Sequence, residues 1–204
     1  MTDIYIVRHG NTFDKGDTIT RVGARTDLPL SASGHTQAEA LALHFITEVP
    51  VGFSAAYCSE LQRTRQTAEA VLAVRDDPPA VETLDFLREV DYGVDENQPE
   101  DAVIARIGEA ALAAWDRDAV PPPGWDVDPE ALKGAWRDLL NSLASTSADE
   151  PVLIVTSNGI ARFVLDAITD FEIQPESIKL KTGAYGRIRA TGEAVTLVSW
   201  NVRP

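Results

Sequence analysis

Ile4-Tyr5-Ile6-Val7-Arg8-His9-Gly10 is the stretch that decides the fold. Its first four residues are apolar and mostly β-branched, which is typical of a strand covered on both faces. The polar triplet Arg8-His9-Gly10 follows at once. In open parallel sheets, ligands bind just beyond the carboxyl ends of the strands. The stretch therefore predicts an α/β protein with a candidate site at one edge of its sheet.

Two further apolar runs repeat this arrangement. They cover residues 53–57 and 152–156, and each is followed by polar residues and then by a helical pattern. A helix is also predicted between the first two strands, from about Gly34, with Ser33 as a candidate N-cap. A β-hairpin is predicted at the end, over residues 185–202. Strands that alternate with helices predict a three-layer α/β/α fold around a mostly parallel sheet.

Residues 95–147 differ from the rest and predict a helical insertion that covers the sheet. Helical patterns run from Ala102 to Trp115 and from Pro129 to Leu143, and Pro121-Pro122-Pro123-Gly124 separates them. We expect residues 1–204 to form a single domain that includes this insertion. The insertion contains three tryptophans, expected to be core anchors, with a specificity surface as the alternative: Trp115, Trp125 and Trp136.

Composition is that of a soluble globular protein, with 44% hydrophobic and 25% charged residues. No apolar run approaches the roughly 18 residues of a membrane helix. Met1-Thr2-Asp3 lacks the basic start of a signal peptide, and the single cysteine, Cys58, excludes an internal disulfide. We therefore expect a cytoplasmic protein that binds no membrane. The sequence leaves the oligomeric state open, with a homodimer as one option.

Three predicted strand ends carry residues suited to a phosphate group. Arg8 to Thr12 follow the first predicted strand. Cys58-Ser59 follow the second, with Arg63 one helical turn later, and Ser157-Asn158-Gly159 follow the third. A guanidinium presents a planar fork of donors that matches phosphate oxygens, and a neutral imidazole can attack phosphorus. The net charge of −14 repels nucleic acid and also a phosphorylated substrate. A phosphate site here thus requires arginines concentrated in a cleft, and we expect a phosphate ion or small phosphorylated molecule as partner.

Four blocks of sequence together resemble the histidine phosphatase superfamily, which includes the cofactor-dependent phosphoglycerate mutases. The first is Ile6 to Thr12, and the second is Gly23 to Gly34 followed by Gln37-Ala38. The third is Ser59 to Ala68, and the fourth is Leu87-Arg88-Glu89 followed by Gly93. They occur in order over nearly the whole chain.

The resemblance implies a role for each matching residue. His9 would be the nucleophile, Arg8 and Arg63 would hold the phosphate, and Glu89 would act as general acid and then as base. Asn11, Thr12, Arg25 and Gly159 would be secondary substrate contacts, although a structural salt bridge is the alternative for Arg25. No histidine pair has the spacing of metal ligands such as His-x3-His, so we expect neither a metal nor another cofactor.

The chain departs from this family at Asn158, where a second histidine is expected. Asparagine donates a hydrogen bond but carries no positive charge. The only other histidines, His35 and His44, lie on the first predicted helix and do not look like substitutes. We therefore expect a phosphatase with reduced activity. The alternatives are a catalytically silent phosphate-binding or scaffold relative and, less favoured, a mutase. Lys15 is a smaller departure, since the family often has asparagine there.

Two rival phosphatase mechanisms do not fit the spacing. A cysteine-dependent phosphatase needs five residues between its cysteine and arginine, whereas Arg63 and Arg65 follow Cys58 after four and six. An aspartyl phosphatase needs its Asp-x-Asp pair at the end of an apolar strand, but Asp126 and Asp128 lie in a loop rich in proline and glycine. The sequence therefore favours neither mechanism.

Overall fold

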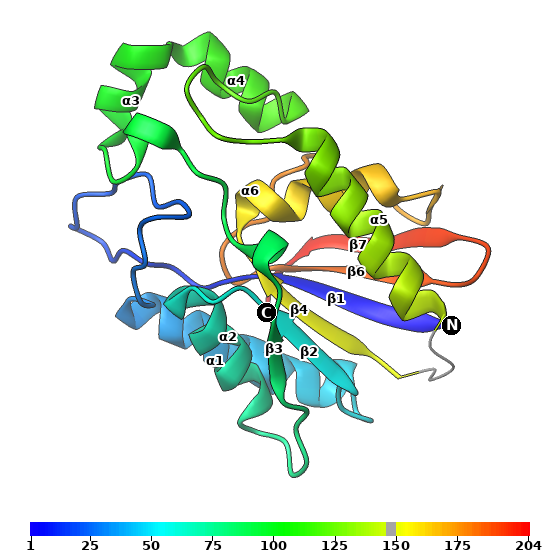
Figure 1. Ribbon diagram of the computed structural model, residues 1–204. Helices are drawn as coiled ribbons and strands as arrows, with labels where there is room; N and C mark the ends of the chain where they lie inside the picture. The colour runs from blue at the N-terminus through cyan, green and yellow to red at the C-terminus, as the bar shows by residue number, and fades with distance from the viewer. Residues whose placement is uncertain (146–149) are drawn as a thin grey trace.

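A seven-stranded sheet with the strand order β3-β2-β4-β1-β6-β7-β5 forms the centre of the computed structural model (Figure 1), which describes residues 1–145 and 150–204. The four strands β3 (Val81–Thr83), β2 (Ala55–Cys58), β4 (Val152–Thr156) and β1 (Thr2–Arg8) are parallel. The sheet continues with β6 (Tyr185–Ala190) and β7 (Val195–Val202), which form the predicted antiparallel hairpin, and ends with β5 (Asp170–Phe171).

Helices cover both faces of this sheet, which confirms the predicted three-layer fold. One face carries α1 (Ala32–Glu48) and α2 (Gln62–Leu72), and the other carries α5 (Pro129–Ser145) with the 3-10 segment η3 (Arg162–Ala167). The alternation of β1 serves both cores: Ile4 and Ile6 join one apolar cluster, and Tyr5 and Val7 join the other. Since all four are almost fully buried, the uninterrupted apolar run is explained by burial on two sides.

Two sequence-based boundaries were wrong. Helix α1 begins at Ala32 and is capped by Ser31, not by Ser33: Ser31 has extended backbone, and its Oγ accepts a hydrogen bond from Gly34 N at 3.2 Å. The Ser33 hydroxyl instead accepts from Asn11 Nδ2. The strand predicted over 53–57 is β2, shifted to 55–58, and Phe53 is a core residue in front of it.

The segment between β3 and β4 contains the predicted helices, but two helices stand where one was predicted from Ala102 to Trp115. Gly108, with φ +82°, ends α3 (Glu100–Ile107) and precedes α4 (Glu109–Asp118). The short 3-10 turns η1 (Asp85–Leu87) and η2 (Gly93–Asp95) come before them. The last two residues of the predicted insertion, 146 and 147, lie outside the described residues. The three tryptophans are buried in the core, as expected: Trp115, Trp125 and Trp136.

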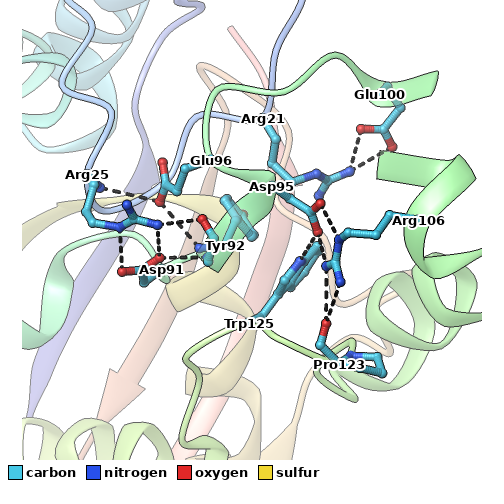
Figure 2. Close-up of polar contacts among 11 residues, drawn as sticks. Arg21, Arg25, Asp91, Tyr92, Asp95, Glu96, Glu100, Arg106, Pro123 and Trp125 are labelled. Carbon is cyan, nitrogen blue, oxygen red and sulfur yellow. Dashed lines mark hydrogen bonds and ion pairs between the residues drawn. The ribbon is translucent and has the colours of Figure 1, made fainter. Parts of the chain in front are cut away.

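A polar network joins the loop after β1 to the start of the helical segment (Figure 2). The buried carboxylate of Asp95 accepts hydrogen bonds from Arg106 Nε at 2.6 Å and from Trp125 Nε1 at 2.7 Å. Nearby, Arg21 Nη2 donates to both carboxylate oxygens of Glu100, at 2.7 and 2.5 Å. Arg21 and Glu100 line the cavity described next, and Trp125 packs behind it against Tyr92 and Trp115, which also line it. Among the described helices, none is both long and apolar enough to cross a membrane.

Candidate active site

A cavity of about 540 Å³ opens at the carboxyl ends of β1 and β4. Parallel pairing of these two strands, with Arg8 beside Thr156, brings the first and third predicted strand ends together. Six of the residues predicted from the sequence line the cavity: Arg8, His9, Asn11, Thr12, Glu89 and Asn158. The structure thus collects residues that lie up to 150 positions apart in the sequence (158 minus 8).

His9 lies at the cavity, and one of its ring nitrogens is hydrogen-bonded to the backbone. Its Nδ1 is 2.7 Å from the carbonyl oxygen of Gly10, which only accepts hydrogen bonds, so Nδ1 carries the proton and Nε2 keeps its lone pair. Burial, followed by the positive charges of Arg63 and Arg8, holds the pKa of His9 well below its usual value. Such a neutral imidazole with an unprotonated Nε2 can attack phosphorus.

Gly10 is required for this geometry because the chain passes very close to α1. A Cβ at Gly10 would lie 2.4 Å from the carbonyl oxygen of Gly34. The Gly10 N–H also donates to Thr67 Oγ1 at 3.2 Å, which ties the loop to α2. The loop that holds His9 is therefore fixed from two helices.

The two predicted phosphate-binding arginines flank His9 but differ in access. Arg8 lines the cavity and donates through Nη1 to Leu180 O at 2.9 Å. Arg63 is fully buried, does not line the cavity, and donates to the carbonyl oxygens of Thr26 and Gly23 at 2.9 and 3.1 Å. Both Nε atoms are buried without a hydrogen-bond partner among the described residues. Burial lowers the pKa of both guanidinium groups.

Glu89 is 6% exposed and is held by two backbone amides. Its Oε1 accepts from the Val90 N–H at 2.9 Å, and its Oε2 accepts from the Gly159 N–H at 3.2 Å. Gly159, predicted as a substrate contact, does not line the cavity and instead supports Glu89. The carboxylate remains on the cavity wall, where it can exchange a proton with a bound molecule.

Asn158 begins the short helix α6 (Asn158–Ala161) and has a fixed orientation. Its Oδ1 accepts a hydrogen bond from the Leu180 N–H at 2.8 Å. Since the carbonyl end of the amide is engaged, the Nδ2 group is left as the donor available at the cavity. The side chain thus provides one neutral donor at the place where the family resemblance expects a histidine.

Arg25, like Gly159, is a predicted substrate contact that does not line the cavity. It makes a bidentate ion pair with Asp91 at 2.8 and 3.0 Å, its side chain is 57% exposed, and it does not line the cavity (Figure 2). The structural salt bridge weighed from the sequence is therefore what the geometry shows. Lys15, by contrast, does lie on the cavity wall.

Sequence reasoning missed Arg162, which lines the cavity although it is only 3% exposed. Its spacing could have indicated this position, because Arg162 follows Asn158 by four residues and residues four apart lie on the same side of a helix. Glu89 favours the charged forms of Arg8, Arg63 and Arg162, which places all three guanidinium groups near one carboxylate. With Glu89 as a carboxylate, these four groups together carry a charge of about +2. This matches a phosphate dianion in a chain whose net charge is −14.

The residues of the rival mechanisms lie elsewhere. Cys58 is buried on β2, and burial raises the pKa of its thiol to about 11. Asp126 and Asp128 line a second pocket of about 250 Å³, which adjoins the first at Glu89 but does not include His9 or Arg8. Within the described parts of the chain, no three His, Cys, Asp or Glu side chains are grouped so as to hold a metal ion.

Comparisons with known proteins agree with this fold. The chain is 20% identical to the mycobacterial glucosyl-3-phosphoglycerate phosphatase, with a TM-score of 0.77 and 99% of each chain covered. It is 18% identical to the phosphoserine phosphatase of Entamoeba histolytica (TM-score 0.75, 99% and 98% covered). It is 22% identical to YhfR of Bacillus stearothermophilus (TM-score 0.77, 100% and 98% covered).

Sequence comparison gives the family. No curated protein sequence matches the chain significantly. Residues 4–203, however, match the profile of the histidine phosphatase superfamily (branch 1). That match covers nearly every residue, including all four blocks identified in the sequence. The chain therefore belongs to the histidine phosphatase superfamily.

Proposed function

We propose that this protein is a phosphomonoester phosphatase that acts through a phosphohistidine on His9. The observation that carries the proposal is the state of that ring: Nδ1–H is bound to Gly10 O, so a neutral Nε2 is available in a cavity of local positive charge. Its membership of the superfamily supports the same chemistry.

In the first step, His9 Nε2 attacks phosphorus, the N–P bond forms, and the bond from phosphorus to the ester oxygen breaks. The protonated carboxyl of Glu89 gives its proton to the leaving oxygen, which departs as an alcohol. Arg8, the buried Arg63 and the amide of Asn158 stabilise the negative charge on the phosphoryl oxygens. Each of these groups is held by backbone contacts before substrate binds.

In the second step, a water molecule attacks phosphorus and the N–P bond breaks. Glu89, now a carboxylate, accepts a proton from this water, and inorganic phosphate leaves with His9 neutral again. The two amide donors at Glu89 keep the carboxylate in one place through both steps. Water, the only co-reactant, has access because the cavity is open to solvent.

Small phosphorylated molecules are the proposed substrate class. A cavity of about 540 Å³ has room for a phosphate ester of modest size. Its walls combine the aromatic rings of Tyr92 and Trp115 with charged groups, including Lys15 and Lys179. Asn11 and Thr12 lie at the same cavity and are proposed as secondary substrate contacts.

The test is hydrolysis of p-nitrophenyl phosphate by wild type and His9→Ala between pH 5 and 8. We expect slow turnover by wild type and none by His9→Ala, together with a phosphate adduct on His9 detected by mass spectrometry after quenching without acid. Equal background rates for the two proteins contradict the enzyme. In that case, retained binding of inorganic phosphate would identify a catalytically silent phosphate-binding relative.

A further inference from the structure

Arg162 is a buried cation with no neutralising partner in direct contact. Within the described part of the chain, its hydrogen bonds go to two backbone carbonyl oxygens: Nε donates to Asn158 O at 3.2 Å, and Nη1 donates to Trp115 O at 2.5 Å. No carboxylate oxygen is among them. A buried charge without a counter-ion is costly, so such a group is expected where an anion binds.

Trp115 holds this guanidinium in place from the helical segment. The guanidinium carbon lies 4.1 Å from the centre of the Trp115 ring, which is a cation–π contact, and Trp115 O accepts from Nη1. Trp115 is itself 1% exposed in the core. Arg162 is therefore positioned before any ligand arrives, and little side-chain entropy is lost when it binds one.

The remaining donors of Arg162 are available to the cavity. Nη2 has no acceptor among the described residues, is not among the fully enclosed atoms, and belongs to a residue that lines the cavity. Arg8 lines the same cavity, and hydrogen bonds through Leu180 and Asn158 connect the two side chains: Arg8 Nη1 donates to Leu180 O at 2.9 Å, the Leu180 N–H donates to Asn158 Oδ1 at 2.8 Å, and Arg162 Nε donates to Asn158 O. Two guanidinium groups of like charge are thus held near each other, an arrangement that an anion between them would stabilise.

We infer that Arg162 binds the phosphoryl group together with Arg8 and supplies the positive charge that a histidine at position 158 would supply. This inference rests on the proposed function of the same cavity. Arg162 is placed to do so because it lies one helical turn after Asn158 and its Nε donates to the Asn158 carbonyl oxygen. The guanidinium of Arg162 then replaces, one helical turn away, the positive charge that asparagine lacks at position 158.

The experiment compares Arg162→Gln with a matched surface control, Arg137→Gln. Arg137 lies on α5, and its half-exposed side chain pairs with Asp166 away from the cavity. The substrate is p-nitrophenyl phosphate, whose only anionic group is the phosphate, and orthovanadate affinity is measured by calorimetry. We expect Arg162→Gln to lose about 10²-fold in rate and to bind orthovanadate more weakly, while Arg137→Gln matches wild type in both.

A double variant separates charge supply from a purely structural role. If Arg162 and a histidine at position 158 serve the same function, Asn158→His should restore a larger fraction of activity in the Arg162→Gln protein than it adds to wild type. A structural defect at Arg162 would not be rescued in this way. Thermal unfolding of each variant shows whether it is folded, and Arg162→Lys, which keeps the charge, should retain part of the rate if Arg162→Gln is unstable.

The outcomes distinguish this inference from the proposed function. Wild-type rate and orthovanadate affinity in folded Arg162→Gln would overturn the inference and leave a His9-dependent phosphatase intact. A normal rate on p-nitrophenyl phosphate with weaker turnover of a phosphorylated carboxylic acid would also overturn it, because Arg162 would then bind a second anionic group. If wild type shows no His9-dependent turnover, the proposed phosphatase activity is contradicted. Comparison of orthovanadate affinity between wild type and Arg162→Gln then still tests whether Arg162 contacts the bound anion.

Discussion

Gly159 and Glu89 are in direct contact across the site. The Gly159 N–H donates to Glu89 Oε2 at 3.2 Å, and a Cβ built on Gly159 would lie 2.1 Å from Glu89 Oε1. The same Cβ would be 3.2 Å from a methyl carbon of Val90, which limits where the carboxylate could move. Gly159 thus belongs to the site because the absence of a side chain there lets Glu89 occupy its position.

Gly159→Ala should therefore displace Glu89 and impair proton donation to the leaving group. We expect hydrolysis of alkyl phosphates to fall by about 10²-fold or more, as for loss of a general acid. Hydrolysis of p-nitrophenyl phosphate should fall less, since its leaving group needs little protonation. Steady-state rates on the two substrate classes check this.

Gly134→Ala is the matched control for that substitution. Gly134 lies inside α5, and a Cβ there meets no atom within 4 Å. This variant should keep wild-type rates and gain up to about 1 kcal/mol of stability, because alanine favours the helix. An equal fall of Gly159→Ala on both substrate classes would contradict the role assigned to its contact with Glu89.

Asn158→His should raise the rate of p-nitrophenyl phosphate hydrolysis. The Leu180 N–H that now donates to Asn158 Oδ1 could donate to Nδ1 of the imidazole, which leaves Nε2–H as a donor that reaches farther into the cavity. Removal of a donor costs about 10²–10³ in rate, and Asn158 is a weaker donor rather than an absent one, so a gain of about tenfold is expected.

Asn158→Ala is the comparison for this change, and it should be slower than wild type because it has no donor. A folded Asn158→His protein with no gain would show that the surroundings of position 158 no longer accommodate the role of a histidine. Thermal unfolding of the three proteins separates this outcome from misfolding.

The fold and much of the site were predictable because they depend on short segments of sequence. The buried strands follow from uninterrupted apolar runs, and parallel pairing then brings Arg8 and Asn158 to one edge of the sheet. What could not be predicted depends on contacts between distant segments. Arg25 pairs with Asp91, and Arg162 rests on Trp115, and nothing in the local sequence specifies either contact.

The helical segment shows the same limit. Gly108 could be tolerated within a helix, and only its positive φ in the folded chain reveals that it separates α3 from α4. The N-cap was misplaced because Ser31 and Ser33 are both competent; in the folded chain Ser31 accepts from Gly34 N, whereas the Ser33 hydroxyl accepts from Asn11. At such positions local propensity allows more than one boundary, and contacts with distant segments determine which one forms.

Cys58 should be chemically inert in the native protein. It is fully buried, and burial raises the pKa of its thiol to about 11, so the reactive thiolate is scarce near neutral pH. We expect iodoacetamide at pH 8 to leave Cys58 unmodified and activity unchanged until the protein is unfolded in urea. Rapid inactivation of the folded protein, with one alkyl group found on Cys58, would revive a cysteine-dependent mechanism.

Asp95→Asn should destabilise the polar network that lies behind the cavity wall. The buried Asp95 carboxylate accepts from Arg106 and from Trp125 Nε1, and asparagine keeps the size but loses the charge that Arg106 pairs with (Figure 2). Weakening a buried charged hydrogen-bond group costs about 1–3 kcal/mol. In a chain of 204 residues this lowers the melting temperature by about 5 °C, which calorimetry can measure.

The pH dependence of this loss tests its electrostatic origin. Hydrogen bonds from Arg106 hold the pKa of Asp95 below its ordinary value of 3.8, so the stabilisation is complete above that pH and is lost as the pH falls toward the folded-state pKa. The difference in stability between wild type and Asp95→Asn should therefore be constant near neutral pH and shrink below about pH 4.

Asp118→Asn is the control, because Asp118 pairs with Arg117 at an exposed position and its change should be within about 0.5 kcal/mol. A difference that stays constant down to pH 3 would mean that Asp95 acts through packing, and the ion pair with Arg106 would then contribute nothing to stability.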